Sequence, residues 1–261
     1  MEKHLERDGG PDGSKRLLLI ADTHFSLDEV DTIQDTADIW KYGDKYGCDE
    51  LVVGGDISES VEDAAKLYLE EVFDSFRVAR GNHDTWSPED LYREVRKNTE
   101  ESGSILVGNH IKWPAGNEEN EYLIGMCHRP HEFHIRSKRQ ESGMEWEEDI
   151  ILYGHSHAPY DRILGKDDTL AIGMGSTFSN YNIPYESGTR LRRSFQILEI
   201  RDDDLKIMNY DFDRDLLIEE AVYREEGEGF EEVYKDYHGV PDYPEEERKV
   251  SQPGRRVFAS V

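Results

Sequence analysis

The stretch Arg80-Gly81-Asn82-His83-Asp84 decides the fold of this chain. It follows a short apolar segment, so it lies where a buried strand is expected to end. Asn, His and Asp side chains in consecutive positions can bind a metal ion or transfer a proton. Taken alone, the stretch is a weak signal, because polar residues are common after strands.

The same kinds of side chain follow four other apolar runs. They are Asp22 and His24 after residues 17–20, Asp56 after 51–53, His128 after 123–124, and His155 with His157 after 150–152. In α/β proteins the carboxyl ends of neighbouring strands meet at one edge of the sheet, where ligands bind. Five strand-like runs that each end in Asp, Asn or His therefore predict one shared metal site at such an edge.

The spacing of apolar residues predicts alternating strands and helices in the first half of the chain. Strands are expected at residues 16–21, 50–53 and 76–79. Helices are expected from the Ser26/Glu29 capping pattern to Gly43 or Gly47, over residues 61–73, and from Ser87-Pro88 to about Glu101.

The second half of the chain predicts closely spaced strands. Residues 105–107 and 111–113 flank Gly108-Asn109, which favours a hairpin turn. Further strands are expected at 122–126, 150–153, 162–164, 170–172, 195–200 and 205–210, and a helix at Leu216–Tyr223. Together these elements predict an α/β fold in which two packed mixed sheets are flanked by helices, a four-layer α-β-β-α sandwich.

No long Gly/Ser-rich or Pro-rich linker divides the chain, so we expect one main domain. Residues 1–15 are expected to form a flexible leader, and residues 16–211 the domain. Residues 212–261 are strongly charged but contain aromatic side chains. This composition favours an appendage that packs on the domain or on a neighbouring subunit of a homo-oligomer.

The chain carries 58 acidic and 31 basic residues, which gives a formal net charge of −27. General binding to nucleic acid or to an anionic membrane is not expected, because both are polyanions. Such acidity favours a halophilic protein, although an acidic mesophilic protein with a charged tail remains open.

Cys48 and Cys127 lie far apart without zinc-site spacing, so they predict buried thiols in a reducing compartment. The sequence shows no signal peptide and no apolar stretch that could span a membrane. We therefore expect a cytoplasmic protein.

The candidate ligands are seven Asp, Asn and His side chains without Cys, a set that suits Mn, Fe, Zn, Co or Ni better than a thiolate zinc site. They are Asp22, His24, Asp56, Asn82, His128, His155 and His157. Seven ligands exceed the needs of one ion, and a carboxylate can bridge two ions. Two ions about 3.5–4 Å apart can share a hydroxide and hold the oxygens of a phosphoryl group. We expect two divalent transition metal ions, with Mn the first choice.

Five motifs follow one another along the chain: Asp22-Thr23-His24, Gly54-Gly55-Asp56, Gly81-Asn82-His83-Asp84, His128 and Gly154-His155-Ser156-His157. In order and spacing they resemble the motif set of the calcineurin-like metallophosphoesterases. The resemblance covers residues 16–210. The short chain and its Gly173-Met174-Gly175-Ser176 segment look most like the small bacterial and archaeal phosphodiesterase branch.

The resemblance implies a role for each motif residue. Asp22, His24, Asp56 and His157 would hold one metal ion, and Asp56, Asn82, His128 and His155 the other. His83 would protonate the leaving group, and Asp84 would orient the His83 ring. The implied reaction is hydrolysis of a phosphodiester or phosphomonoester bond by attack of a metal-bridging hydroxide.

Some positions depart from the family pattern. The segment Cys127-His128-Arg129-Pro130-His131 offers two histidines where the family has one beside a Gly; His128 is preferred because it is nearest the strand end, and His131 is the alternative. Glu59 or Asp63 could replace an acidic residue that usually follows the Asp56 loop.

Several basic side chains could receive substrate phosphate or could form a solvated basic face. They are Arg129, Arg136, Lys138 and Arg139, and further along the chain Arg190, Arg192 and Arg193. Of these, Arg129 is the predicted substrate-binding residue, since it follows a proposed ligand.

Two other functions fit the same motifs. A scaffold could keep the fold without catalysis, as in a eukaryotic trafficking subunit that this branch resembles, but a scaffold needs no proton donor such as His83. A nuclease would use the same metals, but the charge of −27 disfavours it unless the basic segment at Arg136 forms a local track. We therefore expect a metal-dependent phosphoric ester hydrolase.

Overall fold

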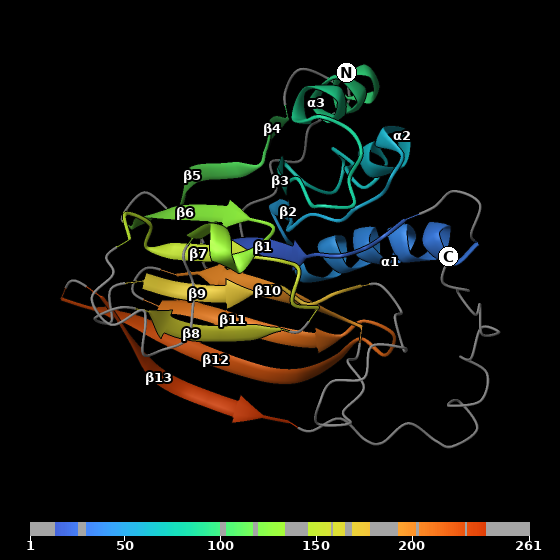
Figure 1. Cartoon of the computed structure of the whole chain (residues 1–261). Coiled ribbons are helices and arrows are strands. Elements are labelled where there is room, and N and C mark those ends of the chain that lie inside the picture. The colour runs from blue at the N-terminus through green and yellow to red at the C-terminus, as the bar shows by residue number, and fades with distance from the viewer. Residues whose placement is uncertain are drawn as a thin grey trace, which may run out of the picture.

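The computed structural model describes residues 14–25, 30–99, 103–116, 120–133, 146–157, 159–164, 169–177, 193–201, 204–227 and 229–238. The Ser26/Glu29 capping pattern lies outside these ranges, and so do Arg136, Lys138, Arg139, Arg190 and Arg192. Residues 1–13 and 239–261 lie outside them as well. Two mixed β-sheets pack face to face; Figure 1 shows the five-stranded sheet, green to yellow, in front of the eight-stranded sheet.

The eight-stranded sheet has the order β13-β12-β11-β10-β1-β2-β3-β4. Its parallel half consists of β1 (Lys15–Ile20), β2 (Glu50–Val53), β3 (Ser75–Ala79) and β4 (Ser104–Gly108). Its antiparallel half consists of β10 (Ser194–Ile200), β11 (Asp204–Asp211), β12 (Leu216–Glu226) and β13 (Gly229–Tyr237). Strands β2 and β3 are buried along their whole length, which is typical of parallel strands covered on both faces.

The five-stranded sheet has the order β5-β6-β7-β9-β8. Its strands are β5 (His110–Gly116), β6 (Glu121–Cys127), β7 (Ile150–Tyr153), β8 (Tyr160–Leu164) and β9 (Thr169–Gly173). The three central strands, β6, β7 and β9, run parallel, and the edge strands β5 and β8 run antiparallel to their neighbours. Both sheets are therefore mixed, as predicted.

Side chains along β1 alternate between two cores. Leu17 and Leu19 belong to the core between the sheets, together with Ile124 of β6 and Leu152 of β7. The intervening Leu18 packs on the other face of the same strand, in the core under the helices. A strand with two buried faces needs the continuous apolar run that the sequence shows.

The helices α1 (Val30–Tyr46), α2 (Val61–Ala65) and α3 (Pro88–Asn98) lie on one side of the fold, against the eight-stranded sheet. Helix α3 begins as predicted, because Ser87 and Asp90 form a reciprocal capping box before Pro88. The short 3-10 helix η1 (Pro130–Phe133) follows β6. None of the described helices is both long and apolar enough to cross a bilayer. The five-stranded sheet carries a smaller apolar cluster that includes Ile151 and Tyr153.

Three predicted elements differ from the structure. The hairpin at Gly108-Asn109 is wrong, because β4 pairs with β3 in one sheet and β5 pairs with β6 in the other. The chain changes sheets at this point, so Ile105 packs under the helices and Ile111 packs between the sheets. The helix expected over residues 61–73 is regular only to Ala65 and continues as turns.

The helix expected at Leu216–Tyr223 is wrong, because these residues begin strand β12, which pairs antiparallel with β11. The spacing of buried residues there fits a strand, since Ala221 and Tyr223 both face the core between the sheets. Strand β13 pairs in turn with β12. The eight-stranded sheet thus continues past Asp211, after which an appendage was expected to begin.

Candidate metal centre

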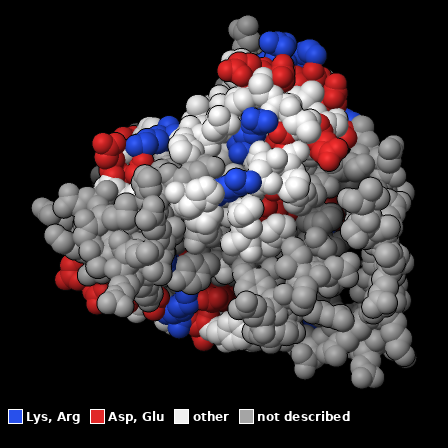
Figure 2. Space-filling view, viewed as in Figure 1, with Lys and Arg blue, Asp and Glu red and all other residues white. Residues whose placement is uncertain are grey.

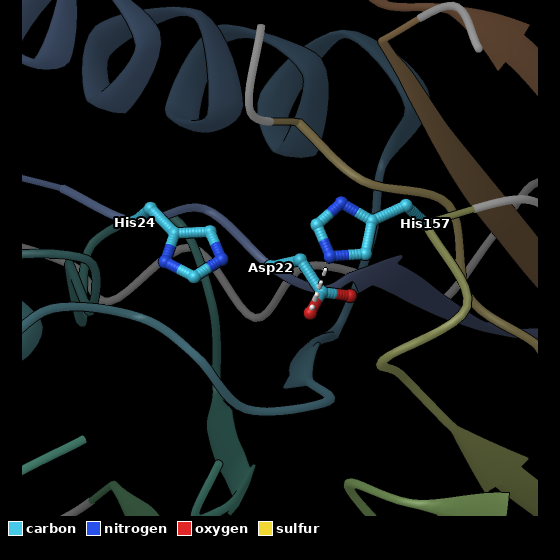
Figure 3. Close-up of side chains that lie close together, drawn as sticks. All are labelled: Asp22, His24 and His157. Carbon is cyan, nitrogen blue, oxygen red and sulfur yellow. Dashed lines mark ion pairs between the residues drawn. The ribbon is translucent and has the colours of Figure 1, made fainter. Parts of the chain in front are cut away.

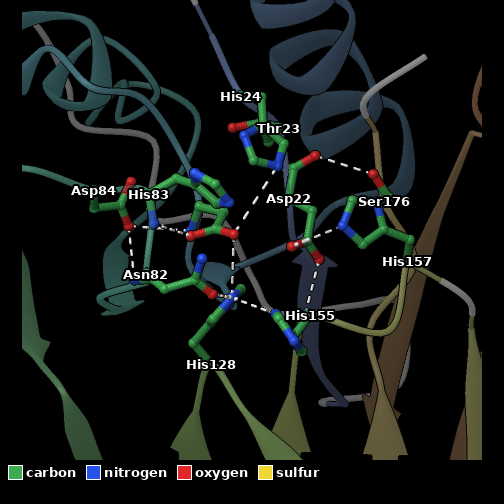
Figure 4. A network of polar contacts seen from close by, with 12 residues as sticks. Asp22, Thr23, His24, Asn82, His83, Asp84, His128, His155, His157 and Ser176 are labelled. Carbon is green, nitrogen blue, oxygen red and sulfur yellow. Dashed lines mark hydrogen bonds and ion pairs between the residues drawn. The ribbon is translucent and has the colours of Figure 1, made fainter. Parts of the chain in front are cut away.

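Five loops at one edge of the two sheets bring the predicted ligands together. They follow β1, β2 and β3 of the larger sheet and β6 and β7 of the smaller sheet. Within each set the strands are parallel neighbours, so their carboxyl ends lie at the same edge. The packing of the sheets then places the two sets of loops side by side (Figure 4).

The backbone of the site holds an unusual conformation. Among the described residues, six other than glycine have a positive φ angle, and five of these are predicted ligands. They are Asp22 (50°), His24 (47°), Asp56 (52°), His155 (64°) and His157 (56°). A residue with a Cβ atom loses roughly 1–2 kcal/mol in this left-handed region. Such strain persists where the surrounding structure holds it, and it is concentrated at functional sites.

Asp22, His24 and His157 form the first group of ligand atoms, all within 4.8 Å of one another (Figure 3). Asp22 Oδ1 lies 3.5 Å from His157 Nε2 and accepts no hydrogen bond, although Asp22 is fully buried. The other oxygen, Oδ2, accepts the backbone N–H of His155 at 3.0 Å. A buried carboxylate oxygen that lacks a donor is suited to bind a cation.

Asp56, His128 and His155 form the second group, centred on His128 Nε2. This atom lies 3.2 Å from Asp56 Oδ2, 3.1 Å from Asn82 Oδ1 and 3.2 Å from His155 Nδ1 (Figure 4). The other ring nitrogen, Nδ1, lies 2.7 Å from the Gly54 carbonyl oxygen, which can only accept, so Nδ1 carries a proton. All four atoms can then offer a lone pair to one point, an arrangement that requires a cation or a proton among them.

Asp56 connects the two groups. Its Oδ2 lies 3.2 Å from His128 Nε2 and 4.0 Å from His24 Nε2, so one oxygen faces ligands of both groups. Its Oδ1 accepts the backbone N–H of His83 at 2.8 Å. This bond fixes the orientation of the carboxylate that could bridge two ions.

Burial shifts the protonation of the carboxylate and of several histidines in the site. It raises the pKa of Asp22 to about 7 and lowers the pKa of His157 to about 4. It also lowers the pKa of His24 and of His155. The lowered pKa values of the three histidines favour neutral imidazoles, the form that binds metal, whereas a cation must displace the proton that Asp22 holds below about pH 7. Burial opposes protonation of His128, but its hydrogen bond with Asp56 raises the pKa of His128.

A sequence profile of the calcineurin-like phosphoesterase superfamily domain matches residues 16–203. This chain belongs to the calcineurin-like phosphoesterase superfamily. The match agrees with the resemblance seen in the motifs and contains every predicted ligand.

Comparison with solved structures finds the following similarities. Vacuolar protein sorting 29 from Chaetomium thermophilum is 13% identical, with a TM-score of 0.52 over 86% of this chain and 100% of that chain. The same protein from Cryptosporidium parvum is 14% identical (TM-score 0.48, 86% and 98% covered). A predicted phosphoesterase from Streptococcus pneumoniae TIGR4 is 18% identical (TM-score 0.46, 85% and 98% covered). No curated protein matches the sequence.

His83, the predicted proton donor, lies at the exposed side of the site. Its side chain is exposed, and its ring centroid is 5.3 Å from that of His24. Its backbone N–H is bound to Asp56. The ring therefore lies beside the first group of ligand atoms and remains accessible to a bound molecule.

Asp84 binds the backbone of the site. Its buried carboxylate accepts four backbone N–H groups, those of Asp56, Ile57, Ser58 and Gly81, at 2.7–3.1 Å. Among the described residues it makes no contact with the His83 ring. Both carboxylate oxygens accept backbone donors, and the expected role of Asp84 in orienting that ring stays a prediction.

Arg129 reaches the site from the loop after β6. Its Nε donates to Asn82 Oδ1 at 3.2 Å, and its side chain is half-buried. This bond leaves the end of the guanidinium group beside the second group of ligand atoms. The substrate-binding role expected of Arg129 stays a prediction.

The structure favours some of the alternatives over others. His131 is exposed and belongs to neither group of ligand atoms, so His128 remains the preferred ligand. Asp63 pairs with Lys66 in α2, away from the ligands, and the described contact of Glu59 is a hydrogen bond from Thr85 to its carbonyl oxygen. Arg193 binds Asp35, Asp213 and the Thr177 carbonyl oxygen, which is a structural role.

Two residues quoted in the sequence analysis, Ser176 and Arg80, have supporting roles that were not predicted. Ser176 Oγ donates to the backbone carbonyl oxygen of Asp22 at 3.0 Å and supports the strained turn there. Arg80 donates twice to the carbonyl oxygen of Asp84, at 2.9 and 3.1 Å. Ser176 had a signal, since it follows an apolar strand like the ligands do, whereas the contact of Arg80 depends on loop geometry.

Proposed function

We propose that this protein is a dinuclear metal-dependent phosphoesterase that hydrolyses phosphodiester or phosphomonoester bonds. The observation that carries the proposal is the convergence of lone-pair atoms around His128 Nε2, next to a second group around Asp22. Asp22, His24, Asp56 and His157 would hold one ion, and Asp56, Asn82, His128 and His155 the other. When bound, two such ions activate water and neutralise charge on a phosphoryl group. Mn is the first metal to test.

The residues at the opening complete the proposal. Arg129 would bind a non-bridging phosphate oxygen, because its guanidinium group lies next to Asn82. His83 would donate a proton to the leaving oxygen, since its exposed ring borders the first group of ligand atoms. Neither residue is needed to bind metal, so both favour an enzyme over a scaffold.

A nuclease receives less support. Figure 2 shows acidic and basic side chains interspersed over the visible surface of the described residues, without a continuous basic track. The basic segment at Arg136 lies outside the described residues, and the net charge of −27 disfavours a long contact with a nucleic-acid backbone. The proposed substrate is therefore a small phosphate ester.

Elemental analysis and a substrate screen with added Mn would test the proposal. We expect close to two ions per chain after mild dialysis, and hydrolysis of a bis-aryl phosphate or an aryl phosphate. His155→Ala should abolish hydrolysis, whereas the distant surface variant His238→Ala should retain it. Two bound ions without hydrolysis of nucleotides, cyclic nucleotides, phosphopeptides or aryl esters would support the scaffold alternative. A stoichiometry that never exceeds one ion would contradict the dinuclear site.

A further inference from the structure

We propose that Asp84 is a positioning residue that locks together the two loops carrying Asp56 and Asn82, and that it thereby sets the metal affinity of the site. This inference rests on the proposed metal site. It goes beyond the proposed function because it assigns the last residue of the Gly81-Asn82-His83-Asp84 motif to the backbone of the site instead of to proton transfer.

The carboxylate of Asp84 bridges two segments that are distant in sequence. Oδ1 accepts the N–H groups of Ile57 at 2.8 Å and Ser58 at 3.1 Å. Oδ2 accepts the N–H groups of Asp56 at 3.0 Å and Gly81 at 2.7 Å. Asp84 is 2% exposed, so water does not compete for these bonds. A carboxylate is the one side chain of this size that offers acceptors alone on both of its terminal atoms.

The lock is reciprocal. Asp84, in the loop after β3, accepts backbone N–H groups of the loop after β2. Asp56, in the loop after β2, accepts the backbone N–H of His83, in the loop after β3, through Oδ1 at 2.8 Å. Each loop thus fixes the other with a carboxylate. Because Oδ1 of Asp56 is held in this way, its Oδ2 is directed at the histidines of both groups.

The neighbours of Asp84 extend the same contact. Thr85 Oγ1 donates to the Glu59 carbonyl oxygen at 2.7 Å, and Trp86 Nε1 donates to the Ser58 carbonyl oxygen at 2.8 Å. Arg80 holds the carbonyl oxygen of Asp84 from the other side. Residues 84–86 therefore run along residues 56–59 and keep the positive φ angle of Asp56 in place.

The test compares Asp84→Asn with Asp90→Asn. Both changes replace one carboxylate oxygen with an amino group, and both carboxylates accept a backbone N–H, but Asp90 caps helix α3 away from the ligands. In Asp84→Asn an amino group would face two backbone donors, so those bonds are lost. We expect Mn affinity, measured by calorimetry without substrate, to fall roughly 10–100-fold in Asp84→Asn and to stay unchanged in Asp90→Asn.

Hydrogen exchange provides a readout that needs neither metal nor activity. In the metal-free Asp84→Asn protein, the pair of amides that faces the new NH₂ group, either Ile57 and Ser58 or Asp56 and Gly81, should lose protection, whereas all four amides should keep it in Asp90→Asn. If all four amides remain protected in folded Asp84→Asn, the lock is overturned. A wild-type protein that binds no metal would overturn the proposed function, while the exchange measurement would still decide the lock.

Kinetics separate the lock from ring orientation. With the lock, activity lost in Asp84→Asn should be equal for good and poor leaving groups and should return at high Mn concentration. A loss confined to poor leaving groups, with wild-type metal affinity, would overturn the proposal and restore the orienting role. If Asp84→Asn does not fold, Arg80→Gln removes the two bonds to the Asp84 carbonyl oxygen and should weaken Mn binding in the same direction. Unchanged Mn binding in folded Arg80→Gln would then count against the lock.

Discussion

The two sheets contribute differently to the candidate metal centre. The loops after β1, β2 and β3 supply the Asp and Asn ligands and His24, and backbone hydrogen bonds join the first two loops: Asp22 N–H to Gly55 O at 2.9 Å, His24 N–H to Asp56 O at 2.9 Å. The loops after β6 and β7 supply the other histidines, and side chains link them to this frame, as in His128 Nδ1 to Gly54 O at 2.7 Å. We call the loops after β1, β2 and β3 the first region and the loops after β6 and β7 the second region. Changes in the first region should therefore disturb both the backbone structure and metal binding, whereas changes in the second region should mainly disturb metal binding.

The largest expected effect comes from Gly81→Ala. A Cβ atom there would lie 2.1 Å from both the backbone nitrogen and Oδ1 of Asp56, so the two loops of the first region must separate. We expect binding of both metal ions to be lost and the free energy of unfolding to fall by about 1–3 kcal/mol. Elemental analysis and urea denaturation would measure these effects.

Gly227→Ala is the matched control for this prediction. Gly227 has a φ angle of +70°, but a Cβ atom there would meet nothing within 4 Å. We expect a stability loss of about 1–2 kcal/mol from the left-handed conformation, with unchanged metal content. Full metal content in Gly81→Ala would show that the contact between the loops does not control the site.

Single ligand changes test how the two regions share the metals. Asp56→Asn should weaken both ions, because Asp56 Oδ2 faces both groups of ligand atoms. His157→Ala should weaken mainly the ion of the first group, because His157 contacts Asp22 alone among the carboxylates of the site. Calorimetric Mn titrations of the two variants would separate these patterns. Equal losses in both variants would mean that the two ions bind as one unit.

His83 tests whether the first region also takes part in catalysis. His83→Ala should retain both metals and lose roughly 10²–10⁴-fold in turnover on esters with poor leaving groups, the usual range for a positioned proton donor. The loss should shrink for a nitrophenyl ester, because nitrophenolate departs without protonation. Steady-state rates on a series of leaving groups would measure this. An equal loss across the series would assign His83 to positioning of the phosphate.

Much of the first region could be predicted from the sequence, because each ligand directly follows an apolar run that forms a buried strand. The position of these ligands depends on local sequence alone, because Asp56 comes shortly after β2 and Asn82 shortly after β3. The role of Asp84 could not be found in this way. Its four donors lie in two loops, and their directions depend on the positive φ angles of Gly55 and Asp56.

The errors in the fold have a similar origin. Gly108-Asn109 is compatible with a hairpin, but β3 and β6 both offer open edges for pairing, so the two flanking strands join different sheets. In Leu216–Tyr223, the apolar residues 217 and 221 fit both a helix and a strand, and pairing with β11 decides in favour of the strand. In both cases tertiary contacts override a local pattern.

The pH dependence of stability should differ between the wild type and Asp22→Asn, in which a neutral side chain replaces a buried carboxylate. Burial raises the pKa of Asp22 to about 7 in the folded protein, from 3.8 when unfolded. Above pH 7 the metal-free protein must hold a buried charge, whereas near pH 4 Asp22 is protonated and resembles Asn. Metal-free Asp22→Asn should therefore be more stable than the wild type at pH 8, and the difference should narrow as the pH falls to 4.

Urea denaturation in the presence of a chelator would measure this difference. The lowered pKa of His157 makes stability fall as the pH drops from 6.5 to about 4, but this contribution is present in both proteins. The comparison therefore reports on Asp22 together with the histidines that its charge acts on, His157 and His128. A difference that stays constant from pH 4 to 8 would show that Asp22 is charged throughout this range.

The smallest expected effect concerns the surface that surrounds both regions. The formal net charge is −27, so acidic side chains repel one another at low ionic strength. Salt at molar concentration shortens the range of this repulsion to a Debye length of about 3 Å. The folded state concentrates these charges more than the unfolded chain does, so the midpoint of thermal unfolding should rise from dilute buffer to molar KCl. Melting curves should be recorded with a chelator, so that changes in metal binding do not contribute. NaCl should give a similar rise to KCl if screening is the cause. A midpoint that stays flat or falls with salt would remove the halophilic interpretation, and an acidic mesophilic protein would then be the better description of this surface.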